Sequence, residues 1–312
     1  MFTAREMMFG LRERFDYLEC AECGCLQLLD VPSDLSRFYP DDYYSLGDIP
    51  AIADRSGLAK ARKARAAALL RTPARVVDAL VHAGWVSPWF VPTEFMWLAG
   101  LGLRTSSAVC DLGSGSGQVL GWMLEQGFSN LAGFDPYVDH DLCIGGRIPI
   151  RRAGLDDMPG DWDLIMLNHS FEHMAQPAAV LASLRDRLNS NGHIVIRIPI
   201  ATSWAWRTYG ADWAQLDAPR HLFIHTQRSM SILAEQAGMT VARVFFDSGS
   251  FQLWGSEQYR KDIPLRDPRS YFEDPETALF TPAEIKDFER RALRLNKQGA
   301  GDSAGFVLEA VS

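Results

Sequence analysis

A glycine-rich run preceded by an acid, Asp111-Leu112-Gly113-Ser114-Gly115-Ser116-Gly117, has the residue types that hold a nucleotide-like ligand. Glycine permits a tight turn and a close approach of ligand to backbone, and the start of the following helix offers free N–H groups. The dinucleotide spacing Gly-x-Gly-x-x-Gly is imperfect, because its third glycine would fall at Gln118. A carboxylate at Asp111 would repel a pyrophosphate but attract an ammonium group. The run therefore favours a cofactor without phosphate.

A second acid, Asp135, ends the next apolar run and is followed by Pro136. A carboxylate at the end of the second strand of a nucleotide-binding unit can accept hydrogen bonds from both ribose hydroxyls. The alternative is an ordinary turn residue. Because Asp135 completes a strand–glycine–helix–strand unit, we favour the ribose role.

Two stretches with histidines could act on a second substrate: Asn168-His169-Ser170-Phe171-Glu172-His173 and Pro219-Arg220-His221. An imidazole titrates near neutral pH and can take a proton from a nucleophile. The catalytic candidates are His221, His173, Glu172 and Arg220.

Each catalytic candidate has a structural alternative. His221 could fix its own loop, and His173 could cap the turn that follows it. Glu172 could be a buried acid paired with Arg220.

The elements that must position these residues alternate between strands and helices from Ser107 onward. Hydrophobic periodicity predicts strands over 108–112, 130–135, 148–151, 162–167, 193–198, 241–246 and 306–311. It predicts helices over 118–126, from Pro177 to a stop at Gly192, over 226–237 and over 281–294. Alternating strands and helices imply an α/β fold with a parallel, doubly wound sheet, whose ligands bind beyond the carboxyl ends of the strands.

The segment 109–135 resembles the cofactor-binding half of class I S-adenosylmethionine-dependent methyltransferases, and the likeness continues through 163–173 and Asn191-Gly192-His193. Sugar C-methyltransferases and ubiquinone-type small-molecule methyltransferases have a similar Pro-Arg-His motif. The resemblance implies a Rossmann-like, mostly parallel, seven-stranded sheet. It also implies S-adenosylmethionine as cofactor and S-adenosylhomocysteine as product.

The resemblance also implies the cofactor contacts, residue by residue. The glycine loop would surround the methionine part, Asp135 would hold the ribose, and Leu155 and Asp156 would lie along the adenine. The implied cofactor-binding residues are Asp111, Gly113, Ser114, Gly115, Gly117, Asp135, Pro136, Leu155, Asp156, Asn168 and His169. Many relatives have an adenine-reading Asp near the position of Gly154, so that contact must come from Asp156, Asp157 or backbone.

Residues 1–100 are expected to form an N-terminal extension, and residues 101–312 the methyltransferase domain with a C-terminal helix and a final strand. The extension begins irregularly, contains a partial zinc-ribbon-like segment at 15–45, and continues as helices over 58–83, interrupted by Pro73, and over 93–101. The stretch Phe38–Tyr44 resembles a Tyr-rich stretch of sugar-methyltransferase relatives, and its Tyr43-Tyr44 segment is expected to cover the active site from the N-terminal side.

The zinc-ribbon likeness is incomplete. Cys20 and Cys23 are two of the four ligands that a closed zinc site needs, and Cys25 is too near to Cys23 to share the ion. One explanation is a chain that starts downstream of the natural start. We favour free thiols and assign no metal ligands.

Composition restricts the partners. The chain has 312 residues, is 47% hydrophobic and carries a net charge of −8, which is unlike a nucleic-acid-binding protein. The basic stretch 60–75 is interpreted as a solvated helix face. No apolar run reaches the roughly 18 residues of a membrane span. The five cysteines form no disulfide framework, so a cytoplasmic protein is expected.

These patterns predict methylation of a small molecule, with a sugar or polysaccharide precursor as the leading acceptor and C- or O-methylation both open. A quinone or aromatic precursor is the second acceptor class. A NAD-dependent oxidoreductase on a similar sheet is the alternative reaction, against which Gln118 and Asp111 argue. A scaffold that binds the cofactor without activity is a third possibility. The acceptor atom, the need for a base and the oligomeric state stay open.

Overall fold

A central sheet of eight strands runs through the computed structural model, which describes residues 1–39, 56–83, 91–276 and 279–311. Its strands are β4 (Ala108–Leu112), β5 (Asn130–Phe134), β6 (Leu142–Ile144), β7 (Ile148–Arg151), β8 (Trp162–Asn168), β9 (Leu188–Pro199), β11 (Met239–Phe246) and β12 (Ser303–Ala310). They lie in the order β11-β12-β9-β8-β4-β5-β7-β6.

The predicted Rossmann-like sheet is confirmed. β7, β5, β4, β8 and β9 pair in parallel, and β12 inserts antiparallel between β9 and β11. The additional eighth strand is β6, which pairs antiparallel with β7 at the sheet edge. Gly145 and Gly146, both with positive φ, supply the turn between β6 and β7.

Strand order reverses at β4, which has β5 on one side and β8 on the other. Ligands of doubly wound sheets bind beyond the carboxyl ends of the strands at such a switch point. Asp111, Asp135 and Asn168 lie at or directly after the ends of these three strands. The topology thus brings together two carboxylates and one amide that are distant in the sequence.

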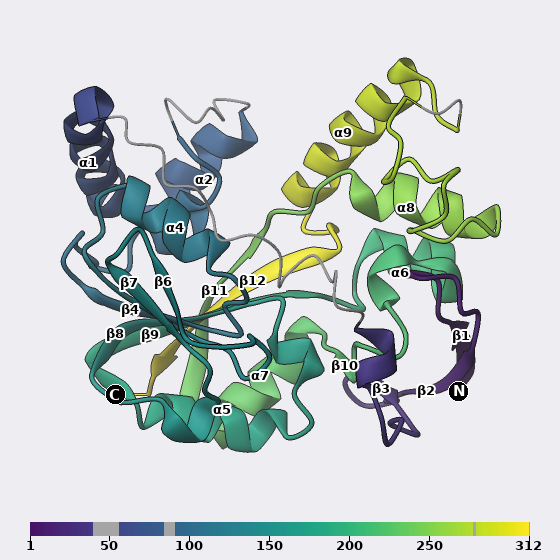
Figure 1. The fold of residues 1–312 in the computed structure, drawn as a ribbon, viewed down its shortest axis with the longest axis horizontal. Helices are drawn as coiled ribbons and strands as arrows, with labels where there is room; N and C mark the ends of the chain where they lie inside the picture. The colour runs from purple at the N-terminus through teal and green to yellow at the C-terminus, as the bar shows by residue number, and fades with distance from the viewer. Residues whose placement is uncertain (40–55, 84–90, 277–278, 312) are drawn as a thin grey trace.

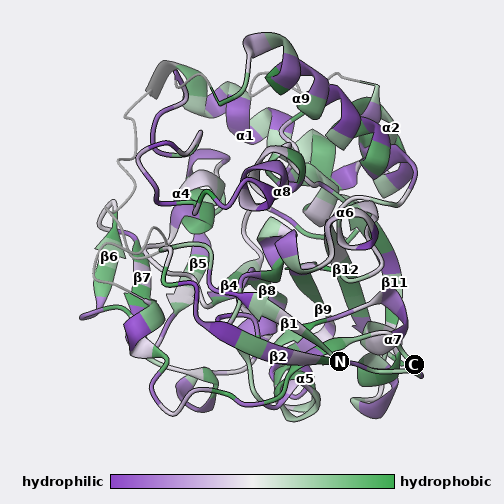
Figure 2. Cartoon of the chain, turned by 90° about the vertical axis from the view of Figure 1, so that its right-hand side faces the viewer, coloured by the Kyte–Doolittle hydropathy of each residue, from purple (hydrophilic) through white to green (hydrophobic). Residues whose placement is uncertain are grey.

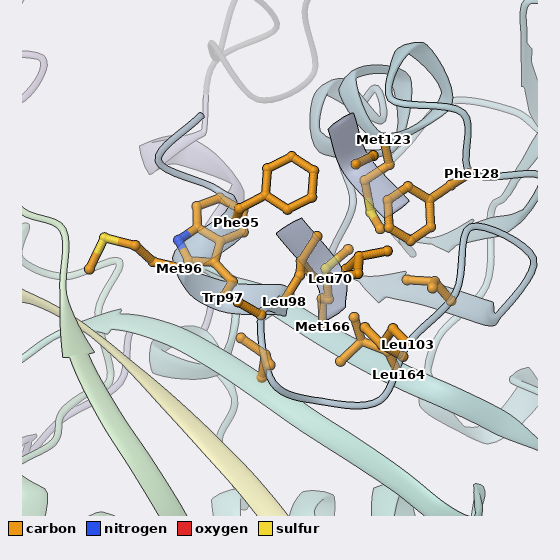
Figure 3. Packing of buried hydrophobic residues seen from close by; sticks show 14 of the residues in the cluster. Leu70, Phe95, Met96, Trp97, Leu98, Leu103, Met123, Phe128, Leu164 and Met166 are labelled. Atoms are coloured by element: carbon orange, nitrogen blue, oxygen red, sulfur yellow. The ribbon is translucent and has the colours of Figure 1, made fainter. Parts of the chain in front are cut away.

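Helices cover both faces of the sheet (Figure 1). α1 (Ser56–Arg71), α2 (Ala74–His82) and α4 (Gln118–Glu125) lie on one face, and α5 (Pro177–Arg185) and α7 (Gln227–Gln236) on the other. α3 (Phe95–Leu98) packs into the same core as α1, α2 and α4. Figure 3 shows Phe95, Met123 and Phe128 packed above Leu164 and Met166 of β8. The alternate residues of β8, Ile165 and Leu167, face the second core under α5 and α7.

The helix that begins at Pro177 was expected to end at Gly192, and this expectation is wrong. The helix ends at Arg185, and Leu188 already pairs with Trp162 as the first residue of β9. Gly192 serves strand packing instead, because a Cβ added there would lie 2.6 Å from the carbonyl oxygen of Trp162. The predicted break at Pro73 is confirmed, since it separates α1 from α2.

A second sheet contains the N-terminus. β1 (Phe2–Arg5), β2 (Arg14–Glu19) and β3 (Leu26–Leu28) pair in sequence, and β10 (Phe223–Ile224) joins β3. The expectation of an irregular first segment is therefore wrong, because strands this short give little periodicity and β3 obtains its second neighbour from far along the chain. The second sheet crosses the predicted boundary at residue 100.

Three helices accompany the second sheet: α6 (Trp204–Tyr209), α8 (Phe251–Arg260) and α9 (Pro282–Lys297) (Figure 1). β2 is mostly hydrophilic, and α9 has both kinds of residue along its length (Figure 2). In the basic stretch of α1, Arg62 pairs with Glu125 of α4 at 3.0 Å. Among the described residues, no helix has the length and apolar character needed to cross a membrane.

Candidate functional site

The glycine loop after β4 adopts a conformation that only glycine takes without strain. Gly113, Gly115 and Gly117 have φ values of 79°, 51° and 83°. A Cβ on Gly113 would lie 2.4 Å from Cβ of Ser170, and one on Gly117 would lie 2.3 Å from Cδ1 of Ile144. The loop is therefore glycine-rich for close packing as well as for its turn.

Asp135 holds this loop in place. Its carboxylate accepts the backbone N–H groups of Gly115 and Tyr137, each at 2.8 Å. Each carboxylate oxygen has a further lone pair for a ligand hydroxyl. Ser114 is half-buried, and Pro136 is exposed beside the acid.

The hydroxyl of Ser116 indicates that the glycine loop binds a ligand. Its hydroxyl is buried and has no hydrogen-bond partner within the described part of the chain. Buried polar groups normally have a partner, so an orphaned hydroxyl in this loop fits a polar cofactor bound against it.

Asp111 is fully buried at the end of β4. Burial raises the pKa of this carboxyl to about 7, although the Asn168 amide donates a hydrogen bond to it at 3.2 Å. A cationic ligand group near Asp111 would favour the ionised form. This carboxyl fits the ammonium group of an amino-acid moiety.

A partly buried network beyond Asn168 was not predicted from the sequence. Arg197 of β9 lies 3.4 Å from the Asn168 oxygen and 2.7 Å from Asp247, which also accepts the indole N–H of Trp97. The Arg197 guanidinium lies 4.0 Å from the Trp97 ring centroid. Arg197, a charged residue inside an otherwise apolar predicted strand, is the sequence signal that could have identified this network.

Leu155 and Asp156 lie in a 3₁₀ turn, Leu155–Asp157, after β7. Leu155 is half-buried and Asp156 is exposed. A Cβ added to Gly154 would meet no atom within 4 Å. There is therefore room for a side chain at position 154, and crowding does not explain why an adenine-reading acid is missing there.

The second group of side chains surrounds Glu172, which lies in the 3₁₀ turn Phe171–His173 and is fully buried. Nδ1 of His169 lies 3.4 Å and Nε2 of His221 lies 3.9 Å from its Oε1 atom. Burial alone would raise the pKa of Glu172, but His169, His173 and His221 together lower it to about 2. His169 has a φ of 52°, a left-handed conformation that is unusual outside glycine.

His173 and His221 face each other, with ring centroids 4.8 Å apart. Nδ1 of His173 lies 2.8 Å from the carbonyl oxygen of Arg220, and Nδ1 of His221 lies 2.9 Å from that of Gln215. Burial, with the neighbouring His173, lowers the pKa of His221 to about 4. His221 is therefore neutral at pH 7.

Arg220 is fully buried and does not pair with Glu172, contrary to the alternative considered from sequence. Its guanidinium lies 2.9 Å from Glu6 and 2.6 Å from Asp217, and it donates to the carbonyl oxygen of Phe38 at 3.2 Å. Neither acid was predicted. Asp217 lies close to the Pro-Arg-His motif, whereas nothing in the sequence links Glu6 to it.

The N-terminal sheet reaches the histidines through two tyrosines. The Tyr39 hydroxyl lies 3.2 Å from Nδ1 of His173, and the Tyr17 hydroxyl donates to the carbonyl oxygen of His221 at 2.9 Å. The Tyr43-Tyr44 segment that was expected to cover the site lies outside the described residues.

The cysteines of the partial zinc-ribbon-like segment form no disulfide in the described part of the chain. Cys20 and Cys23 are partly exposed, and burial raises the pKa of Cys25 to about 12. In the described ranges, the side chains that could jointly hold a metal ion are Glu172, His173 and His221.

A family model described as "Methyltransferase domain" matches residues 53–244. The structure is similar to an S-adenosylmethionine-dependent methyltransferase from Archaeoglobus fulgidus, with 17% identity over 77% of this chain and 95% of that one and a TM-score of 0.42. The Burkholderia thailandensis 1,6-didemethyltoxoflavin-N1-methyltransferase is 17% identical over 74% and 90%, with a TM-score of 0.37.

The mitomycin 7-O-methyltransferase is 10% identical, with a TM-score of 0.42. The match covers 66% of this chain and 49% of that relative, so the chain spans about half of its length. No curated protein sequence matches the chain.

Proposed function

Because the chain belongs to the family of methyltransferase domains, we propose that it transfers the methyl group of S-adenosylmethionine to a small-molecule acceptor. The observation that carries the proposal is the junction between two groups of residues. Ser170, between His169 and Phe171, donates to the carbonyl oxygen of Leu112 at 2.7 Å and so joins the histidine cluster to the glycine loop.

On the cofactor side, the residues present fit the group. Asp111 would bind the ammonium, the glycine loop with Ser114 would hold the methionine part, and Asp135 would bind the ribose. Leu155 and Asp156 would border the adenine, with Pro136, Asn168 and His169 beside the cofactor. When bound, the sulfonium supplies the electrophilic methyl group, so the protein mainly has to align the acceptor behind it.

On the acceptor side, His173, His221 and Glu172 would handle the acceptor's proton. A neutral His221 at pH 7 has a lone pair available for a proton. Arg220 is a positioning residue in this proposal, because it is buried and acts through the backbone carbonyl that holds His173.

The acceptor class that we propose is a sugar or polysaccharide precursor. The support is the similarity of the Pro-Arg-His motif to that of sugar C-methyltransferases. A hydroxylated aromatic or quinone precursor is the second candidate, because the same cluster could act on a phenol.

Calorimetric titration with S-adenosylhomocysteine and, separately, with NADH tests the cofactor. We expect binding of S-adenosylhomocysteine alone. Binding of NADH without S-adenosylhomocysteine would replace methyl transfer by hydride transfer as the reaction.

His221→Ala tests the acceptor side. We expect turnover with nucleotide-linked sugars or phenols to fall about 10²-fold or more, as is typical for loss of an acid–base group, while affinity for S-adenosylhomocysteine stays near normal. The control is His140→Ala, which removes an exposed histidine after β5. Full turnover of His221→Ala with every accepted substrate would exclude His221 from the reaction.

A further inference from the structure

Glu172, His173 and His221 have the composition and spacing of a metal-binding site. One ligand atom from each residue lies within 4.8 Å of those of the other two. Two imidazoles and one carboxylate are the protein ligands of many catalytic zinc sites, which leave a coordination position open. Ligands around such an ion lie about 3.0–3.4 Å apart, so closure by at most about 1.5 Å would complete the arrangement.

The hydrogen bonds of both imidazoles fix the tautomer in which Nε2 is free to bind a metal. A carbonyl oxygen can only accept, so the Nδ1 atoms of His173 and His221 must carry the hydrogens donated to Arg220 and Gln215. Each Nε2 atom is then left with a lone pair. Metal-binding histidines commonly donate their other N–H to a backbone carbonyl in this way, which sets the ring orientation.

Glu172 supplies the second, independent observation. Its side chain is fully buried, and within the described residues neither carboxylate oxygen has a hydrogen-bond partner. The contact of Oε1 with His169 at 3.4 Å is an ion-pair distance without hydrogen-bond geometry. A buried carboxylate without such partners is costly, and a bound cation would compensate that cost.

We infer that Glu172, His173 and His221 bind a divalent transition-metal ion of the zinc class, with a coordination position left for an oxygen of the acceptor. Imidazole nitrogen and carboxylate oxygen ligands together favour such an ion over Ca²⁺ or Mg²⁺, which prefer oxygen ligands alone. His173 is half-buried while the other two side chains are buried, so the approach for an oxygen ligand lies on the His173 side.

This inference deepens the proposed function. Only the part about the acceptor oxygen rests on that function. The three side chains would act on the acceptor's proton through the ion, since a metal-bound oxygen holds its proton less tightly. Metal binding itself does not require S-adenosylmethionine. The two ideas can therefore fail separately.

The test uses the full-length, tag-free, reduced protein after treatment with a chelator, and Co²⁺ as the probe. We expect one Co²⁺ per chain by calorimetry and visible d–d absorption without a thiolate charge-transfer band. Glu172→Gln and, as a second ligand variant, His221→Ala should each weaken Co²⁺ binding at least about 10-fold. Binding of S-adenosylhomocysteine by the same variants checks that they are folded.

Two controls separate this site from other metal ligands. Cys20→Ser/Cys23→Ser and His140→Ala should keep the Co²⁺ affinity of the wild type. The inference is overturned if the wild type takes up no stoichiometric Co²⁺, if folded Glu172→Gln and His221→Ala bind it normally, or if only the cysteine variant loses it. S-adenosylhomocysteine binding without Co²⁺ binding would leave the proposed cofactor intact.

Discussion

Asp135 combines a structural and a proposed binding role in one side chain. Its two oxygens already accept N–H groups from the glycine loop and from the turn after β5. The proposed ribose contact would use the remaining lone pairs. Removing this carboxylate should therefore affect both the loop and the cofactor.

Asp135→Ala is expected to weaken S-adenosylhomocysteine binding by about 1–3 kcal/mol, because charge-assisted hydrogen bonds are lost. Calorimetric titration measures the change. Asp139→Ala, an exposed acid on the same turn, is the matched control and should bind normally. An unchanged affinity of Asp135→Ala would remove this residue from the ribose site.

His225 is a buried histidine outside the proposed chemistry. Its ring packs against Phe171 and Phe223, with Ser229 and the Cys25 thiol near Nδ1. Burial lowers its pKa to about 4, although the Glu172 charge opposes the shift. Between about pH 4 and 6.5 the unfolded chain binds the proton and the folded chain does not, so stability falls as the pH falls through this window.

His225→Leu should therefore reduce the loss of unfolding free energy between pH 7 and pH 5 by about 2 kcal/mol relative to the wild type. Urea unfolding at the two pH values gives the difference, which cancels groups that titrate equally in both proteins. His140→Leu, at an exposed site, should keep the wild-type pH dependence. Equal pH dependence in His225→Leu would show that His225 does not remain neutral in the fold.

At the scale of the element, the glycine loop is a strand–turn–helix unit in which a Cβ at Gly117 would meet the side chains of Ile144 and Ile150. The backbone at Gly117 is left-handed, and Ile144 of the edge strand β6 and Ile150 of its neighbour β7 lie against it. Gly146 offers a comparison, since it has a φ of 67° but nothing within 4 Å of an added Cβ. Comparing substitutions at Gly117 and Gly146 therefore separates the cost of backbone strain from the cost of steric conflict.

Gly117→Ala is expected to lower the free energy of unfolding by about 2–4 kcal/mol, because backbone strain and overpacking add. Gly146→Ala should cost only the strain, about 1–2 kcal/mol. Urea denaturation measures both, and S-adenosylhomocysteine titration should show weaker binding for Gly117→Ala alone. Equal costs for the two variants would show that the loop can move away from the added methyl group.

At the scale of the whole molecule, Arg220 connects the N-terminal sheet to the candidate site. It pairs with Glu6 after β1 and with Asp217 in its own loop, and all three side chains are almost completely buried. Removing the cation would leave two buried carboxylates without their counter-charge. That makes the connection costly to break.

Arg220→Ala should therefore lower the free energy of unfolding by about 3–5 kcal/mol. Arg228→Ala is the control, because its contact with Glu22 is exposed and 3.8 Å long, and it should change stability little. Denaturant unfolding measures both variants. A small effect of Arg220→Ala would mean that Glu6 and Asp217 become protonated or hydrated without structural cost.

The sequence by itself determined the central sheet and the loop that defines it. Apolar runs of strand and helix length, and glycines whose role is local, are visible one after another from Val109 to Asp135. That alternation also predicted that Asp111, Asp135 and Asn168 lie where their strands end, whereas the order of β4, β5 and β8 in the sheet comes from the structure.

Only the tertiary structure decided how the acceptor side is arranged. Glu6, Tyr17 and Tyr39 reach Arg220, His221 and His173 across 214, 204 and 134 residues, and no local periodicity encodes such contacts. The same holds for Arg220, whose acidic partners are Glu6 and Asp217 rather than Glu172. Local patterns report which element a residue belongs to, whereas the partner of a buried charge is set by the packing of elements that meet only in the folded chain.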